Sequence, residues 1–165
     1  MNFVNPIQLT RRNFLVWLAS LIGAMVGCTI QPTQQNVDDT AMDAATIMQP
    51  AVPSPAAFVD YAFEMRRLAL ANGDQAFGAI IVKDNRVVGL GPSRVIVRHD
   101  ATAHAEMEAL RDASRRLGIA DLSGCVMYST SRPCCMCQAA IYWARIDRMY
   151  YGAAGTDAGA PQNSC

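Results

Sequence analysis

Two short segments of this 165-residue sequence carry residue types that bind metal ions, at spacings that suit one site. The first is His-Ala-Glu at residues 104–106, and the second is Pro-Cys-Cys-Met-Cys at residues 133–137. His104, Cys134 and Cys137 could supply one nitrogen and two thiolates, which is the ligand set of a catalytic zinc site with an open fourth position. The two cysteines are three residues apart, so both sulfurs can face one ion from the first turn of a helix.

Two acidic residues follow His104 and could carry protons. Glu106, two residues after a ligand, is placed to take a proton from water and deliver it to a leaving amine. Glu108 is a competing candidate, but we expect it on a solvated helix face, paired with Arg111 three residues later. Cys135 lies about 100° around the helix from Cys134, so we do not expect it to be a ligand.

The elements that must position these residues follow from apolar spacing and turn signals. We expect helices over residues 55–71, from near residue 102 to 117, and over 133–143. Strands are expected over 77–82 and 86–90 as a hairpin, then 125–129 and 148–151, with residues 95–97 continuing the second strand. This order predicts an α/β domain with a mixed sheet. Two parallel strands in it would bring the starts of the second and third helices to one edge, where ligands bind.

Composition limits the classes of protein that remain. Hydrophobic residues make up 52% and charged residues 17%, which excludes wholesale disorder, and the length fits one domain. Lysine and arginine number 14 against 14 acidic residues, so no basic excess favours a protein that coats polyanions. We expect a folded domain over residues 54–157 and a polar tail over 158–165. The even count of six cysteines would also suit a disulfide framework. We favour metal binding by Cys134 and Cys137 over such a framework.

The N-terminal 27 residues look like an export signal. Arg11 and Arg12 precede an uncharged apolar run over residues 14–27, which is too short to span a bilayer. The pair resembles a twin-arginine signal. Residues 25–28 resemble a bacterial lipobox, so Cys28 would be lipidated and contact a membrane. Residues 28–53 are then a flexible tether, and the expected location is the periplasm or cell envelope.

Together, the two metal-binding segments match the signature of zinc-dependent nucleobase and nucleoside deaminases, H-x-E followed by P-C-x-x-C. The resemblance covers about residues 55–158 and includes Phe77-Gly78-Ala79. It implies the three-layer α/β/α fold of the cytidine and deoxycytidylate deaminases, with a mixed central sheet. It also implies that His104, Cys134 and Cys137 bind Zn²⁺, that Glu106 shuttles the proton, and that the Ala105 backbone N–H contacts the base. Members of the family commonly form homodimers.

Within this resemblance, guanine deaminases and tRNA adenosine deaminases are the most similar branches. Residues 140–145 and the position of Asp157 resemble the guanine branch, in which an Asp contacts the substrate. Ser93 stands where both branches place a base-binding Asn, and Arg132 replaces a Glu. The guanine branch also continues beyond the equivalent of Cys165, so we expect a C-terminally short domain and a more open pocket.

Charge and location favour a free purine over tRNA as the substrate. Without Arg11 and Arg12 the exported chain has 12 basic and 14 acidic residues, a net charge of −2, which argues against nucleic acid. The expected reaction is guanine to xanthine and ammonia. The alternatives are deamination of tRNA adenosine or of a cytosine, a non-catalytic zinc-stabilised binding lipoprotein, and a thiol redox protein using Cys134 and Cys137.

Overall fold

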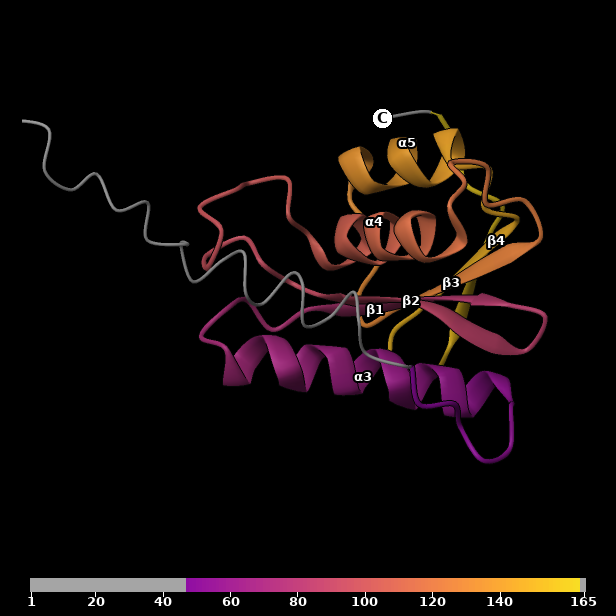
Figure 1. The fold of residues 1–165 in the computed structure, drawn as a ribbon, viewed down its shortest axis with the longest axis horizontal. Coiled ribbons are helices and arrows are strands. Elements are labelled where there is room, and N and C mark those ends of the chain that lie inside the picture. Colours follow the sequence, from indigo (N-terminus) through magenta and orange to yellow (C-terminus); the bar gives the residue numbers. More distant parts are fainter. Residues whose placement is uncertain (1–46, 164–165) are drawn as a thin grey trace, which may run out of the picture. The chain divides into compact units, whose positions relative to one another are not determined.

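The computed structural model describes residues 47–163, which contain a five-stranded mixed sheet with helices on both faces (Figure 1). The strand order is β2-β1-β3-β4-β5, and only β3 and β4 pair in parallel. The strands are β1 (Gly78–Lys83), β2 (Arg86–Pro92), β3 (Cys125–Ser129), β4 (Arg148–Tyr151) and β5 (Thr156–Gly159). The expected signal over 1–27, Cys28, most of the tether and Cys165 lie outside the described residues.

Within residues 47–163, three helices make the outer layers. Helix α3 (Pro55–Ala71) packs its apolar side on one face of the sheet, against a core that includes Ile80, Val82 and Tyr128. Helices α4 (Ala105–Leu117) and α5 (Cys135–Trp143) cover the other face, over a second core. Figure 1 shows α3 on the opposite side of the strands from α4 and α5. The expected three-layer α/β/α fold is therefore confirmed. None of the described helices is long and apolar enough to cross a membrane.

The start of α4 is fixed by two glycines of β2. A Cβ at Gly91 would lie 2.1 Å from the carbonyl oxygen of Ala105, and one at Gly89 would lie 2.6 Å from that of Ala109. Only glycine allows backbone to approach backbone this closely. The helix therefore lies directly on β2, and its first residues stand at the end of that strand.

Helices α4 and α5 both begin at the same edge of the sheet because of the strand directions. β1 is antiparallel to both of its neighbours, so β2 and β3 run parallel to each other on either side of it. Helix α4 follows β2 and α5 follows β3. The prediction that the strands before these two helices run parallel is therefore correct. However, β2 and β3 are not neighbours, as they would be in a simple βαβ unit, because β1 lies between them.

Residues 95–97 do not continue β2, contrary to the prediction. They form a turn whose backbone is fixed by the buried carboxylate of Asp74, which accepts hydrogen bonds from the N–H groups of Ile96 (2.8 Å) and Val97 (2.9 Å). The Ser93 hydroxyl donates to the same carboxylate at 2.8 Å. The prediction of a strand rested only on three consecutive apolar residues, 95–97. In the structure, the Asp74 carboxylate accepts the backbone hydrogen bonds that a neighbouring strand would otherwise accept.

The sequence prediction also missed β5. Residues 156–159 pair antiparallel with β4, although their composition, Thr-Asp-Ala-Gly, is typical of a turn. The strand therefore depends on its neighbour rather than on β propensity, which is weak for Asp and Gly. The domain boundary at 157 falls inside this strand and stays a prediction.

Candidate metal centre and pocket

The three candidate ligands stand at the first turns of α4 and α5. His104 is the N-cap residue of α4, Cys134 is the N-cap residue of α5, and Cys137 is the third residue of α5. Both helices thus start later than predicted, which leaves the two caps with extended backbone. Neither cap side chain makes a capping hydrogen bond to the backbone of its own helix. The imidazole and the thiol are therefore available for a ligand instead of satisfying backbone N–H groups.

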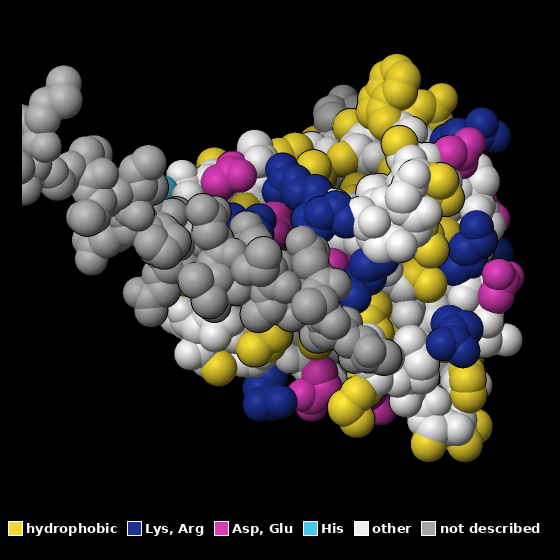
Figure 2. Space-filling view, in the orientation of Figure 1, with side chains coloured by type: hydrophobic (Ala, Val, Ile, Leu, Met, Phe, Trp, Pro, Cys, Tyr) yellow, Lys and Arg dark blue, Asp and Glu magenta, His cyan; other side chains and the backbone are white. Residues whose placement is uncertain are grey.

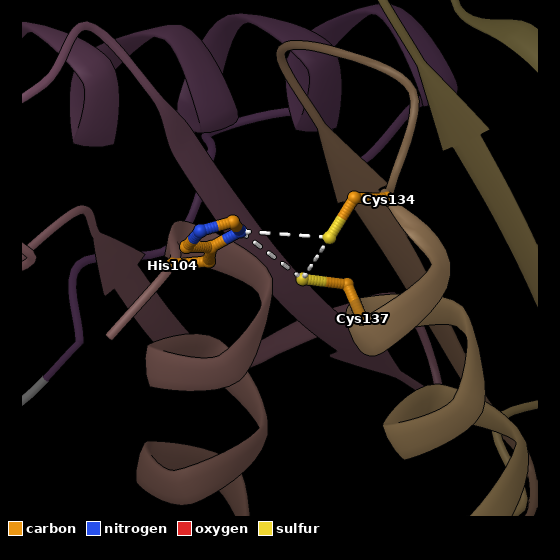
Figure 3. A group of neighbouring side chains, drawn as sticks. All are labelled: His104, Cys134 and Cys137. Carbon is orange, nitrogen blue, oxygen red and sulfur yellow. Dashed lines mark hydrogen bonds between the residues drawn. The ribbon is translucent and has the colours of Figure 1, made fainter. Parts of the chain in front are cut away.

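The side chains of the three residues point toward one another (Figure 3). The Nδ1 atom of His104 lies 3.7 Å from the Cys134 Sγ and 3.6 Å from the Cys137 Sγ, and the two sulfurs are 3.7 Å apart. Zinc bonds of about 2.1 Å to nitrogen and 2.3 Å to sulfur place tetrahedral ligands roughly 3.6–3.8 Å apart. The observed triangle fits a zinc ion with a fourth position left open.

The Cys137 thiol is buried and lies beside an acidic neighbour. Burial raises the pKa of the Cys137 thiol well above its ordinary value, and the carboxylate of Glu106 and the sulfur of Cys134 raise this pKa further. A coordinated thiol loses its proton outright because the ion outweighs these effects. Together with the distances, this donor set means that His104, Cys134 and Cys137 could form a zinc site.

Glu106 lies beside this cluster and is only 5% exposed. Its Oε1 atom accepts a hydrogen bond from the Ser129 hydroxyl at 2.9 Å, and its Oε2 atom lies 3.6 Å from the Cys137 Sγ. Ser129 was not identified from the sequence. Its position as the last residue of β3, at the carboxyl end of the strand, was the available signal.

A pocket of about 140 Å³ opens beside the cluster. Its walls are formed by the starts of α4 and α5, by the segment before β1 and by the segment after β3. The lining residues are Phe77, His104, Ala105, Glu106, Ser131, Arg132 and Cys134. Ala105 is the first residue of α4, so its N–H has no partner within the helix and can serve a ligand.

Two expected substrate contacts lie elsewhere. Asp157 is on β5, where its carboxylate binds Arg148 at 3.1 Å and accepts a hydrogen bond from the Gly159 N–H at 2.8 Å. Ser93 is buried and donates to Asp74. Neither residue lines the pocket beside the cluster, so the structure does not bring them together with the ligands. Their substrate roles stay predictions.

The expectation of a solvated face at Glu108 is wrong. The pairing with Arg111 is present, at 2.6 Å, but Glu108 is buried, and it also binds Arg98 at 2.5 Å and approaches Arg94 at 4.0 Å. Basic side chains gather with acidic ones over α4 and the loop before it (Figure 2). The loop arginines are distant in sequence, so helical spacing could not reveal the burial.

The sequence of this chain is similar to those of known deaminases. The model of the cytidine and deoxycytidylate deaminase zinc-binding region matches residues 54–153. A guanine deaminase from Bacillus subtilis is 46% identical over 82 residues, which are 50% of this chain and 53% of the relative. A tRNA-specific adenosine deaminase from Agrobacterium fabrum is 40% identical over 106 residues, which are 64% of this chain and 70% of the relative.

A solved structure of a guanine deaminase also resembles this chain. The X-ray structure of the guanine deaminase from Bacillus subtilis matches with a TM-score of 0.56 and 39% identity, covering 58% of this chain and 62% of that one. The chain thus spans about half to two thirds of the length of these guanine deaminase relatives. The similarity includes the elements that carry the cluster, since the matched family region contains both metal-binding segments.

Proposed function

Because the chain belongs to the cytidine and deoxycytidylate deaminase zinc-binding family, we propose that it is a hydrolytic deaminase that converts guanine and water to xanthine and ammonia. The observation that carries the proposal is the buried carboxylate of Glu106, held beside both the candidate zinc ligands and the pocket. A zinc-stabilised binding protein would have no need for a proton carrier at this point.

The metal supplies one part of the chemistry. A zinc ion with three protein ligands and an open position lowers the pKa of water that reaches it to about 7. His104, Cys134 and Cys137 would hold the ion through one nitrogen and two sulfur atoms.

The chain's own residues supply the proton transfer. Glu106 takes a proton from the attacking water and later delivers it to the amine nitrogen that leaves as ammonia. The hydrogen bond from Ser129 fixes Oε1, so the carboxylate keeps one orientation through both transfers. The backbone N–H of Ala105 would hold the base with its reacting carbon near Glu106.

Guanine is the substrate that the relatives and the charge favour. The 46% identity to a guanine deaminase supports a free purine, and the exported chain's net charge of −2 gives little attraction for an RNA backbone. The 40% identity to a tRNA-specific adenosine deaminase, across 70% of that protein, favours tRNA adenosine as the second candidate.

The test is an ammonia-release screen on the zinc-loaded full chain. Its substrates are guanine, guanosine, adenine, cytosine and a tRNA anticodon stem-loop, and metal analysis verifies the zinc content. We expect turnover of guanine above the others, and none in the Glu106→Gln variant at unchanged zinc content. Turnover of the stem-loop alone would replace guanine by tRNA adenosine. Retained zinc without turnover of any substrate would favour a non-catalytic binding protein.

We also propose that residues 1–27 export the protein and that Cys28 carries a lipid. The paired arginines, the short apolar run and the lipobox-like segment support this proposal. Fractionation of cells that produce the full chain should recover it in the envelope. Replacement of Arg11 and Arg12 by lysine should retain it in the cytoplasm, and Cys28→Ser should prevent lipidation. Cytoplasmic recovery of the unchanged chain would contradict export.

A further inference from the structure

One wall of the pocket is a short segment after β3 that is fixed at both ends. At its start, the Thr130 N–H donates to the Gly78 carbonyl at 2.9 Å, and the Gly78 N–H donates to the Thr130 hydroxyl at 3.1 Å. At its end, the Gln138 side-chain amide donates to the Pro133 carbonyl at 3.1 Å. Residues 131 and 132 between these points are therefore presented to the pocket by an ordered backbone.

These two residues bring polar groups that are not used within the described fold. Ser131 and Arg132 both line the pocket, and across residues 47–163 no hydrogen bond or ion pair involves the guanidinium of Arg132. The acid in the same lining is Glu106, whose two oxygens face Ser129 and Cys137. The pocket therefore offers a planar, permanently charged donor that is exposed to solvent and open to an acceptor on a ligand.

The geometry of a guanidinium selects among purines. Its fork of parallel N–H groups matches two adjacent acceptors, and the O6 and N7 atoms of a 6-oxopurine are such a pair. A 6-aminopurine presents a donor at the same place, which would oppose the N–H groups. The half-exposed ring of Phe77, at 43% exposure in the same lining, offers an apolar surface for the flat base.

We propose that Arg132 binds the O6 and N7 edge of the substrate and makes the enzyme selective for 6-oxopurines over 6-aminopurines. This proposal rests on the proposed function, because it concerns the substrate of the same site. In this proposal, Arg132 distinguishes 6-oxopurines from 6-aminopurines, whereas Glu106 transfers the proton. Arg132 is then a specificity residue, and its loss should change which purine is used more than it changes the chemistry.

A structural alternative makes a different prediction. Arg132 also lines a smaller hollow of about 80 Å³ together with Gln138, Ala158 and Gln162. A guanidinium directed only into that hollow would support the tail of the domain and would not distinguish one purine from another.

The main experiment compares three purines that share the reacting 2-amino group and differ at position 6. Guanine carries oxygen there, 2-aminopurine carries hydrogen, and 2,6-diaminopurine carries an amine. The measurement is kcat/KM for ammonia release by the zinc-loaded full chain. We expect Arg132→Met to lower kcat/KM for guanine about 10- to 100-fold. It should leave kcat/KM for 2-aminopurine within about threefold, because that purine has no O6 for the arginine to bind.

Two further variants test whether the shape of the guanidinium and its place in the pocket are both required. Arg132→Lys keeps the charge without the fork, so guanine selectivity should fall to a value between those of the original chain and Arg132→Met. The matched control is Arg67→Met on α3, which removes an exposed arginine that is paired with Glu64 and does not line the pocket. This control should leave all three values unchanged. Equal losses on the three purines in Arg132→Met would overturn the proposal.

Binding provides a readout that does not depend on turnover. Hypoxanthine has the O6 and N7 edge and no amine to release, whereas adenine carries the 6-amino group. Calorimetry should show tighter binding of hypoxanthine, and Arg132→Met should remove most of the difference. An unchanged ratio of the two Kd values would refute the role of Arg132. If guanine is not deaminated but the ratio responds to Arg132, the proposed reaction fails while the recognition of 6-oxopurines stands.

Discussion

Glu106 and Glu108 are two residues apart on the same helix and equally buried, at 5% exposure each, yet their surroundings differ completely. Glu106 lies against the Ser129 hydroxyl and the Cys137 sulfur. Glu108 faces cations, Arg98 and Arg111, at 2.5 and 2.6 Å. Burial therefore does not by itself identify a catalytic acid. The partners distinguish the two acids, because the oxygens of Glu108 are engaged in ion pairs with arginines, whereas Glu106 lines the pocket beside the candidate ligands.

The difference follows from helix geometry. Two residues advance the helix by about 200°, so the two side chains leave it on opposite sides. One side faces β3 and α5, and the other faces the loop between β2 and α4, which contributes Arg94 and Arg98. Substitutions of the two acids and of their partners test this division.

The largest effect is expected at Glu106. Glu106→Gln keeps the shape and the acceptor for Ser129 but cannot carry a proton, so kcat should fall by about 10³-fold or more. Unfolding by denaturant and zinc content should stay near the values of the unchanged chain. A variant that keeps a tenth or more of kcat would show that another group moves the proton.

Glu108→Gln should give the opposite result. The change leaves the arginines around a buried position without their negative partner, which should cost about 3 kcal/mol of unfolding free energy. The folded fraction should retain kcat within about threefold, because Glu108 does not line the pocket beside the cluster. Denaturant titration and kinetics on the same preparation separate the two quantities. Lost kcat at unchanged stability would assign Glu108 to the reaction.

Ser129→Ala tests whether the neutral partner of Glu106 contributes. Loss of one hydrogen bond to a charged group should reduce kcat about tenfold, with KM little changed. Ser123→Ala is the matched control, since Ser123 donates to the exposed carboxylate of Asp121 and does not line the pocket. Equal kcat for the two variants would mean that Glu106 keeps its orientation without Ser129.

The smallest effect concerns a third buried acid, Asp74. Burial acts to raise the pKa of Asp74, but hydrogen bonds from Val97, Ser93, Gln75 and Ile96 outweigh it and lower the pKa below the ordinary value. The unfolded chain therefore binds protons first, so this stability is full above about pH 4 and is lost as the pH falls through the lowered pKa. Asp74→Asn should flatten the acid limb of a stability–pH curve, and an unchanged limb would contradict this.

The sequence predicted the position of the metal-binding cluster better than the groups that surround it. The three ligands and Glu106 follow from residue types at helix starts, since a local motif determines where they lie. The burial of Glu108, the bond from Ser129 and the turn at residues 95–97 depend on partners 10 to 23 residues away in other elements. Helical periodicity treats a charged residue as exposed, so it cannot reveal an acid that a distant loop neutralises.

The positions of His104 and Cys134 as N-caps have a consequence for folding. Neither side chain makes the hydrogen bond that a Ser or Asp would make to the first turn, so both helix starts lack a side-chain cap. An ion bound by both residues would tie together two points 30 residues apart, as a cross-link does, and restrict the unfolded chain in the same way. Binding of the metal ion would thus also order the first turns of α4 and α5 during folding.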